Sequence, residues 1–458
     1  MAPATARPEV RTTCAYCGVG CGVLARPDGR GGLAVSGDPA HPANLGRLCS
    51  KGSALGETVG LEDRLLHPMI GGARASWDEA IGLVADRFRE TMAEHGPGSV
   101  GFYVSGQMLT EDYYVANKLI KGFMGSANID TNSRLCMAST VAGHKRAFGT
   151  DTVPGTYEDL ELADLVVLVG SNLAWCHPVL YQRLAAAKAA RPEMRVVVID
   201  PRRTATCDIA DMHLALAPGS DVALFNGLLA RLADLGAIAE DVDARVEGFG
   251  EAIASARADD PAATGLSPQD LEEFWFLFAG TEKVVTVFSQ GVNQSARGSD
   301  KVNAILNCHL ATGRIGRPGM GPLSVTGQPN AMGGREVGGL ANMLACHMDL
   351  ENATHRAAVQ EFWQSPGLPA KPGLKAVDLF RAVGSGKIKA LWIICTNPVA
   401  SVANRKTVIA GLERAELVIT QDAFADTETN GYADVVLPAS LWTESEGVMV
   451  NSERNLTL

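Results

Sequence analysis

Four cysteines near the start of the chain carry its strongest chemical signal: Cys14, Cys17, Cys21 and Cys49. The first three are separated by gaps of two and three residues, and the fourth follows after a long interval. That spacing suits a [4Fe–4S] cluster, in which each iron takes one thiolate at a separate corner. A structural zinc site more often shows two C-x-x-C pairs around a single ion. We therefore predict a cluster, with zinc or unrelated cysteines as the alternatives.

Cys136 stands apart from the other cysteines, in the polar segment N-I-D-T-N-S-R-L-C-M-A-S-T. A lone cysteine is usually a small buried apolar side chain. Its polar neighbours and Arg134 favour a second interpretation, a thiolate ligand to a metal carried by a cofactor. The remaining cysteines lack such a context, and we expect them to lie in the core: Cys176, Cys207, Cys308, Cys346 and Cys395.

The elements that would position these residues follow an alternating pattern. Short apolar runs alternate with helical stretches, which is typical of a parallel sheet with helices on both faces. We predict an amphipathic helix from Trp77 to about Glu94, with Ser76 as N-cap and Glu79 completing a capping box. Residues 1–66 show only short turns around the cysteines, and 365–373 reads as a surface loop. Buried strands are predicted at 165–169, 195–199, 284–288, 391–394 and 417–419.

Small polar turns follow these strands at the edge where parallel sheets bind ligands. The turn G-S-N at 170–172 ends one strand, and Asp200 ends the next. The arrangement recurs where Asn397 follows one strand and Asp422 ends the next. A small polar turn for a phosphate, with an acid for a ribose or base on the neighbouring strand, is typical of dinucleotide sites. One such turn is weak evidence, but its recurrence predicts two related sites and two nucleotide-bearing groups.

Composition narrows the class of protein. The 458 residues include 51 acidic and 40 basic side chains, and the net charge of −11 argues against a nucleic acid or an anionic membrane as partner. Ten cysteines in so long a chain do not resemble a secreted disulfide scaffold and suit a reducing compartment. Residues 1–10 contain neither an apolar leader nor a twin arginine, and no apolar run approaches a membrane span. We therefore expect a cytoplasmic protein.

In its motifs the chain resembles the molybdopterin oxidoreductases of the dimethyl sulfoxide reductase superfamily, most closely the cytoplasmic assimilatory nitrate reductases. The similarity runs from about Arg11 to the last residue. The motifs are C-A-Y-C-G-V-G-C, L-C-S-K-G, S-R-L-C-M-A-S, G-S-N-L-A-W-C-H-P, I-D-P-R-R-T, A-P-G-S-D, G-V-N-Q-S, T-G-Q-P-N-A-M-G-G-R-E-V-G and T-N-P.

The resemblance implies an α/β fold with an N-terminal iron–sulfur subdomain and two doubly wound α/β dinucleotide-binding domains around a cofactor cleft. The iron–sulfur subdomain would occupy 1–66. One α/β domain would be discontinuous, formed by 67–133 and 320–430, and a Rossmann-like domain would occupy 134–319. Residues 431–458 would begin a truncated C-terminal region.

The resemblance also implies the cofactors. A [4Fe–4S] cluster would bind the four N-terminal cysteines, and molybdenum held by two molybdopterin guanine dinucleotides would take Cys136 as its protein ligand. Lys51 would be the polar bridge for electrons between cluster and pterin, and its alternative is a solvated surface lysine. Cofactor contacts are implied for Gly170, Ser171, Asn172, His177, Asp200, Arg202, Thr204, Gly219, Asp221, Gly291, Asn293, Gln294, Gln328, Asn397 and Asp422.

The reaction implied by the resemblance is reduction of nitrate to nitrite by oxygen-atom transfer at molybdenum, with electrons delivered through the cluster. Arg335 is expected to orient nitrate, since a guanidinium matches a planar oxyanion bidentately. Its alternative is a salt bridge with Glu336 or a contact with a pterin phosphate. Met137 would supply an apolar wall of the substrate pocket, although methionine is most often a core residue.

Two other functions compete with nitrate reduction. Formate dehydrogenases of the superfamily carry a histidine next to the metal-binding residue, whereas Met137, Ala138 and Ser139 follow Cys136 here. A non-enzymatic iron–sulfur scaffold subunit, like the large peripheral subunit of respiratory complex I, would lack the metal thiolate and the pterin loops, which this chain has.

Relatives in the superfamily continue into a β-barrel domain that completes the second pterin site, whereas this sequence stops at Leu458. We expect a protein ending there to hold the cluster but to bind the full cofactor poorly. The electron donor is expected to be either a ferredoxin or an NADH-dependent flavoprotein subunit. Scattered arginines are usually solvated surface, but a landing patch near the cluster would draw on Arg11, Arg26, Arg30, Arg47 and Lys51.

Overall fold

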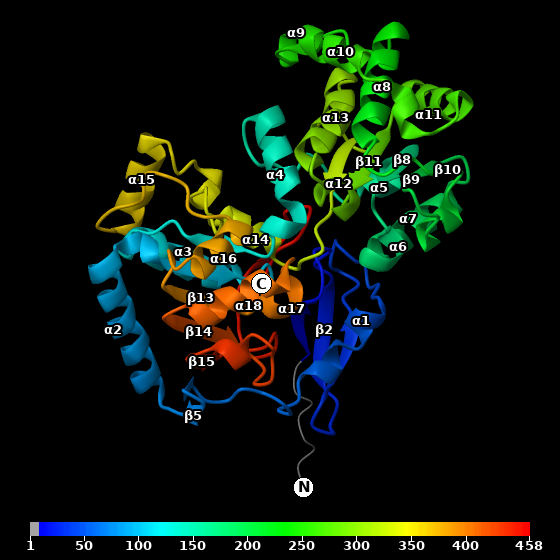
Figure 1. Cartoon of the computed structure of the whole chain (residues 1–458). Coiled ribbons are helices and arrows are strands. Elements are labelled where there is room, and N and C mark those ends of the chain that lie inside the picture. Colours follow the sequence, from blue (N-terminus) through cyan, green and yellow to red (C-terminus); the bar gives the residue numbers. More distant parts are fainter. Residues whose placement is uncertain (1–8) are drawn as a thin grey trace.

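The computed structural model describes residues 9–458, and residues 1–8, part of the segment expected to lack a leader, lie outside the described residues. Two largely parallel sheets flanked by helices form most of the molecule, and a small antiparallel sheet lies near the N-terminus (Figure 1). The predicted α/β fold class is confirmed. Within residues 9–458, no helix is both long enough and apolar enough to cross a lipid bilayer.

The N-terminal region forms a three-stranded antiparallel sheet of β1 (Val10–Thr13), β2 (Gly22–Pro27) and β3 (Leu33–Gly37). The prediction of short turns alone in this region was wrong. Glycine or proline lies at the ends of β2 and β3. Because the strands are also short, the sequence shows no clear apolar run there. The cysteine-rich segment connects β1 to β2, and helix α1 (Ser50–Ser53) follows Cys49.

A five-stranded parallel sheet occupies the middle of the chain. Its strands lie in the order β10-β9-β8-β11-β12, and β8 and β11 are buried along their whole length. The direction of chain progression reverses between β8 and β11, so the carboxyl ends of these two strands border the crevice where such sheets bind ligands. The strands predicted at 165–169, 195–199 and 284–288 are confirmed. The bounds are β8 Leu165–Val169, β9 Arg195–Ile199, β10 Met212–Leu214, β11 Val284–Phe288 and β12 Gly321–Ser324.

Helices cover both faces of this sheet, which explains its continuous apolar runs. On one face lie α8 (Asp221–Asp234), α11 (Pro268–Gly280) and α13 (Gly298–Ala311), whose side chains share a core with Leu165, Val167 and Val169. On the other face, α7 (Pro178–Ala190) packs in one cluster with the cysteine-rich loop. The loop that would carry the cluster is thus fixed against a parallel sheet.

A seven-stranded sheet forms the second large unit, in the order β5-β4-β15-β14-β13-β6-β7. The short edge strands β4 and β5 are antiparallel, and the other five strands are parallel. Here the chain order reverses between β6 and β13. The predicted strands 391–394 and 417–419 lie within β13 and β14. The bounds are β4 Met69–Ile70, β5 Ala73–Arg74, β6 Val100–Val104, β7 Ile129–Thr131, β13 Ala390–Ile394, β14 Leu417–Asp422 and β15 Val435–Pro438.

The predicted amphipathic helix is α2 (Trp77–His95), and its capping box between Ser76 and Glu79 is present. The segment 365–373 contains no helix or strand, as predicted for a loop. Helix α4 (Arg134–Phe148) lies between the two parallel sheets (Figure 1) and carries Cys136. The other helices of six or more residues are α3 Thr110–Asn117, the π-helix η3 Lys118–Phe123, α10 Phe249–Ala258, α14 Ala331–Glu336, α15 Ala353–Trp363, α16 Ala376–Gly384 and α18 Arg405–Arg414.

Short elements complete the described chain. They are η1 Leu55–Thr58, η2 Pro97–Ser99, α5 Asp159–Leu162, α6 Leu173–Cys176, η4 Ala205–Ile209, α9 Val242–Arg245, η5 Pro261–Thr264, α12 Gln290–Asn293, η6 Ala345–His347, α17 Pro398–Ser401, η7 Asn430–Tyr432, β16 Met449–Val450 and β17 Leu456–Thr457. β12 pairs with β11 and β15 with β14, so the two sheets extend a few residues past the boundaries expected at 319 and 430.

Candidate functional site

The four N-terminal cysteines line a single cavity together with residues of α7 and of the loop before α1. The backbone N–H of Cys14 donates to the carbonyl of Cys21 (2.9 Å), which closes the loop. Gly20 adopts a positive φ of 64°, a conformation that costs glycine little. A Cβ on Gly18 would lie 2.4 Å from Thr326, so the loop packs tightly at this point.

The electrostatics of this cavity favour a cluster. Burial raises the pKa of the Cys14 thiol to about 12, and it raises the pKa of Cys17 and of Cys21 as well. Such buried thiols become thiolates only beside strong positive charge, which bound metal supplies. Four thiols in one cavity supply one thiolate for each iron of a [4Fe–4S] cluster.

Lys51 is exposed on α1, beside this cavity. Its positive charge opposes the effect of burial on the pKa of Cys17. The same charge acts to lower the pKa of Cys176 and of His177, at the end of the short helix α6 that follows β8. The ammonium is thus near enough to act on Cys17 of the cluster cavity and on Cys176 and His177. Its role as an electron bridge stays a prediction.

The first predicted half-site lies where the five-stranded sheet reverses its order. Gly170 follows β8 with a φ of 50°, and its carbonyl accepts from the N–H of Gly291 (3.0 Å), which follows β11. A Cβ on Gly170 would lie 2.8 Å from the backbone of Gly291, and one on Gly291 would lie 2.7 Å from Gly170. The two turns therefore touch, and backbone groups are available to a ligand at the sheet edge.

Polar groups around this contact have the donor and acceptor character that a nucleotide needs. Within residues 9–458, Ser171 Oγ, Thr204 Oγ1 and His177 Nδ1 are buried and have no hydrogen-bond partner. Buried polar groups are normally satisfied, so these three atoms are available to a ligand. Asp200 is buried at the end of β9 and accepts from the N–H of Arg202 (2.9 Å), whose side chain is exposed.

Other predicted contacts of this sheet have partners within the chain. Asn172 accepts from Thr206 (2.9 Å). Asp221, at the start of α8, forms a 2.6 Å ion pair with Lys301 of α13, and Gly219 precedes it in an exposed loop with a φ of 92°. The side-chain oxygen of Asn293 accepts hydrogen bonds from Thr140 of α4. The side-chain amide of Gln294 donates to the carbonyl of Leu135, also in α4.

The second predicted half-site lies where the seven-stranded sheet reverses its order, between β6 and β13. Asn132 joins both strands, since it accepts from the N–H of Gly106 (2.8 Å) and donates to Thr396 (3.3 Å). Gln328 donates to Asn132 (2.7 Å) and accepts from Ser133. The side chain of Asn397 donates a hydrogen bond to Glu428 and accepts one from Thr429. Burial raises the pKa of Asp422 at the end of β14.

Cys136 lies between the two half-sites, in the first turn of α4. Its half-buried sulfur is 3.7 Å from the amide nitrogen of Gln290, which follows β11, and Ser133 contacts Gln328 on the other side. The sulfur therefore faces a polar group, in contrast to a thiol sealed among aliphatic side chains. Helical geometry is interrupted at Met137 (φ −124°, ψ 17°), which turns the side chain after the thiol into a neighbouring cavity.

Met137 and Arg335 line the same cavity, together with Tyr113, Thr131, Ser133, Ala138, Val141, Ala331, Gly334, Gly339 and Leu340. The Arg335 guanidinium is buried and binds Asp151 through two nitrogens, with Nε 2.6 Å from Oδ2. Burial alone would raise the pKa of Asp151, but Arg335 and His347 together outweigh burial and hold that pKa far below its usual range. The expected alternative partner, Glu336, is not the one that the structure shows for Arg335.

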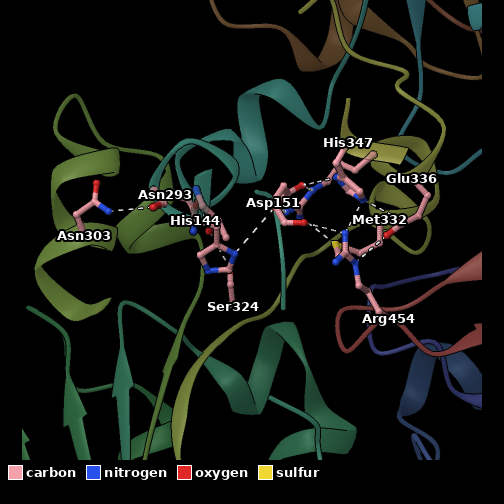
Figure 2. A network of polar contacts seen from close by, with 12 residues as sticks. His144, Asp151, Asn293, Asn303, Ser324, Met332, Glu336, His347 and Arg454 are labelled. Carbon is pink, nitrogen blue, oxygen red and sulfur yellow. Dashed lines mark hydrogen bonds and ion pairs between the residues drawn. The ribbon is translucent and has the colours of Figure 1, made fainter. Parts of the chain in front are cut away.

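A polar network behind Arg335 joins residues far apart in the sequence. His347 lies between Asp151 and Glu336, and Arg454 from the C-terminal segment donates to Glu336 (2.8 Å) and to the carbonyl of Asp151 (2.9 Å). Figure 2 shows the side chains of Asp151, His347, Glu336 and Arg454 turned toward one another. Asp151, His347 and Arg454 are not predictable as site residues from the sequence, because no spacing pattern in the chain links them.

The cysteines outside the two metal sites are not all in the core. Cys207 and Cys308 are buried as predicted, and Cys395 is half-buried at a left-handed backbone position. Cys176 and Cys346 are exposed, so the prediction of core positions was wrong for them. Cys176 is the last residue of the short helix α6, and Cys346 lies in the short helix η6.

Comparison with known proteins agrees with this geometry. A family model described as molybdopterin oxidoreductase matches residues 64–458, and a model of the molybdopterin oxidoreductase Fe4S4 domain matches residues 8–60. Proteins named nitrate reductase from Klebsiella oxytoca and Shewanella frigidimarina are 57% and 48% identical to this chain, and each alignment covers 98% of it. The chain spans about half the length of these relatives, 52% and 49%.

More distant proteins share the architecture. A periplasmic nitrate reductase from Desulfovibrio desulfuricans is 38% identical over 99% of this chain and 63% of its own length. The solved structure of acetylene hydratase from Pelobacter acetylenicus superimposes with a TM-score of 0.78, covering 97% of this chain and 64% of the other, at 20% identity. At that identity the superposition shows a common fold.

Proposed function

Because this chain belongs to the molybdopterin oxidoreductase family and includes its Fe4S4 domain, we propose that it takes part in reducing nitrate to nitrite. The observation that carries the proposal is the cavity that Met137, the residue after Cys136 in α4, shares with Arg335. A planar oxyanion fits a guanidinium, and an apolar methionine wall limits water around it. The similarity to relatives named nitrate reductase supports the same substrate.

The proposed reaction consumes nitrate, two protons and two electrons and yields nitrite and water. When bound, the molybdopterin group supplies the two-electron chemistry, and the cluster passes electrons singly. The chain would hold these groups through Cys136 and through Cys14, Cys17, Cys21 and Cys49. Its own contribution at the substrate is to bind and orient the anion with Arg335, while Asp151 fixes the guanidinium plane.

We also propose that the cofactor contains two pterin guanine dinucleotides. Two parallel sheets each reverse their strand order beside Cys136, and each reversal is a place where such sheets bind a nucleotide. The touching turns at Gly170 and Gly291 and the unpartnered Ser171, Thr204 and His177 support the first site. Asn132, Gln328 and Thr396 support the second.

Oxidation of a reduced viologen dye by nitrate tests the reaction, and formate with an oxidised dye tests the rival dehydrogenase. Among residues 9–458, those lining the cavity include no histidine that would handle a formate proton. A Cys136→Ala variant should lose nitrate turnover and keep its iron, whereas Cys308→Ala, a buried thiol remote from both sites, should keep both. Iron without molybdenum in the native protein would favour the scaffold function instead.

For the electron donor we propose an acidic carrier, a ferredoxin or an NADH-dependent flavoprotein subunit, that docks near the cluster. Arg26, Arg30 and Lys51 are exposed in the region of the small N-terminal sheet and α1. Arg11 is exposed beside Asp38, and Arg47 is half-buried. Replacing Arg26 and Arg30 by Glu should slow reduction by ferredoxin and leave dye-driven turnover intact; equal loss of both activities would contradict docking.

We propose a cytoplasmic location and an assimilatory role. All ten cysteines lie within the described residues and are free thiols, which suits a reducing compartment. Because a periplasmic relative exists, cell fractionation with an antibody to the chain is the direct test. Recovery in the periplasmic fraction would contradict the proposal.

A further inference from the structure

His347 occupies an unusual position between two carboxylates at the back of the Arg335 cavity. Its Nδ1 lies 3.5 Å from Asp151 Oδ2 and its Nε2 lies 2.8 Å from Glu336 Oε2, and the side chain is 12% exposed. Cys346 and His347 both adopt left-handed backbone conformations, with φ of 55° and 57°. Two successive residues other than glycine in this region cost conformational energy, and such strain collects at functional sites.

The Nε2 atom of His347 faces two groups that make opposite demands. Nη2 of Arg454, 2.6 Å away, is always a donor and needs a lone pair on Nε2. The carboxylate of Glu336 is an acceptor and needs a proton there. A neutral ring with a bare Nε2 satisfies Arg454, and a protonated ring satisfies Glu336. The network therefore has two arrangements, selected by one proton.

The same proton changes the net charge of the cluster. Arg335 and Arg454 carry two positive charges, and Asp151 and Glu336 carry two negative charges, so the four cancel when His347 is neutral. His144 of α4 lies 4.0 Å from Asp151, and burial lowers its pKa to about 4, so it adds no charge near neutral pH.

Other charges near the network are already matched. Lys145 of α4 is paired with Asp349, two residues beyond His347, and these two charges cancel. Within the described chain, the ring of His347 is therefore the group that decides whether this side of the cavity is neutral or positive.

We propose that His347 is a positioning residue whose protonation releases part of the charge of Arg335 from Asp151 and makes it available to nitrate. A protonated ring gives Asp151 a second positive partner at the oxygen that Arg335 Nε also contacts. This inference rests on the proposed nitrate reduction and on Arg335 as the residue that orients the anion. His347 itself does not line the cavity.

The direction of the pH dependence follows from the surroundings of the ring. Burial lowers the pKa of His347, but the hydrogen bond to Glu336 and the nearby carboxylate of Asp151 together outweigh burial and raise it. The ring is protonated below this raised pKa and neutral above it. Nitrate affinity should therefore be highest at mildly acidic pH and fall as the pH rises through the pKa.

Steady-state kinetics of the holoenzyme separate this role from general damage. Between about pH 6 and about pH 9, we expect the KM for nitrate to rise roughly five- to tenfold, the lower range of coupling between linked sites, with a much smaller change in kcat. In His347→Gln the KM should be flat and close to the high-pH value of the native enzyme. His95→Gln, on α2 beside Glu94 and remote from the cavity, should keep the native profile.

A second variant should act in the opposite sense. Glu336→Gln removes one negative charge from the cluster and the acceptor that holds the proton on His347. At high pH its KM for nitrate should lie below that of the native enzyme, and its pH midpoint should move down. A loss of affinity in both His347→Gln and Glu336→Gln would contradict the charge mechanism, because damage to the fold has no such sign.

A measurement on the native enzyme needs no variant. By linkage, nitrate binding should be accompanied by proton uptake near the pKa of His347, which calorimetric titration with nitrate in two buffers of different ionisation enthalpy detects. No proton uptake, or a KM independent of pH, overturns the inference while nitrate turnover persists. Absence of nitrate turnover at every pH overturns the proposed function instead.

Discussion

Lys121 offers a sharp test of how the cavity is held together. Its side chain is fully buried in η3, and Nζ donates to the carbonyls of Gly338 (2.8 Å), Leu340 (2.9 Å) and Met343 (2.6 Å). Leu340, which carries one of these carbonyls, and the adjacent Gly339 line the Arg335 cavity. The amino group of one lysine therefore fixes the loop that forms part of the Arg335 cavity.

The pH dependence of stability gives the magnitude. Burial lowers the pKa of Lys121 from 10.5 to about 7, and the nearby Asp130 only partly offsets this. Between these two pKa values the unfolded chain binds a proton that the folded chain does not, so stability rises with pH. At about 1.4 kcal/mol for each pKa unit, the gain between pH 7 and pH 10 is about 4 kcal/mol.

The variant Lys121→Met isolates this contribution, because methionine keeps most of the aliphatic stem and cannot be charged. Urea titration gives the difference in the free energy of unfolding between the native chain and Lys121→Met. We expect this difference to rise by about 4 kcal/mol from about pH 7 to about pH 10. Lys118→Met, on the same π-helix over the ring of Tyr114, should show no such rise. A difference independent of pH would contradict the lowered pKa of the Lys121 amino group buried against this loop.

Three further outcomes test other parts of the structure. Asp151→Asn should lower the free energy of unfolding by about 3–5 kcal/mol by urea titration, because it leaves Arg335 buried without a counter-charge, whereas Asp300→Asn, in an exposed pair with Arg146, should change it by less than about 1 kcal/mol. Gly170→Ala should reduce the molybdenum content measured by mass spectrometry more than the iron content, because its methyl group would strike the backbone of Gly291, and equal loss of both metals would contradict a pterin half-site. Gly18→Ala should do the reverse and reduce iron, since its methyl group would strike Thr326 beside the cluster loop.

Those features that depend on local sequence were predictable. The cysteine spacing, the capping box of α2 and the buried strands each depend on residues close together in the chain, and all are present. The strands of the five-stranded sheet were clear because helices cover both faces, which requires apolar residues at nearly every position. The small strands β1–β3 were missed because they are short and partly exposed, so neither period nor apolar run marks them.

The partner of Arg335 shows why contacts between residues far apart in the sequence could not be predicted. Adjacent residues on a helix point about 100° apart, so Arg335 and Glu336 of α14 cannot readily pair, although they are neighbours in the sequence. Arg335 turns inward to Asp151, and Glu336 turns to His347 and Arg454. Asp151 follows α4 in a segment that reads as an ordinary turn, and only tertiary packing gives it a functional neighbour.

The C-terminal segment connects the loop of the N-terminal cysteines with the polar network around Arg335. Ser452 Oγ donates to the carbonyl of Gly18 in the cluster loop (3.0 Å) and accepts from the N–H of Thr326 (3.0 Å). Two residues later, Arg454 binds Glu336 and His347 behind the anion cavity. One short stretch of backbone thus contacts both the loop that would hold the cluster and the network that orients Arg335. Since a site works only when supporting contacts fix its reacting groups, this segment would be as much part of the proposed site as the cysteines whose loop it contacts.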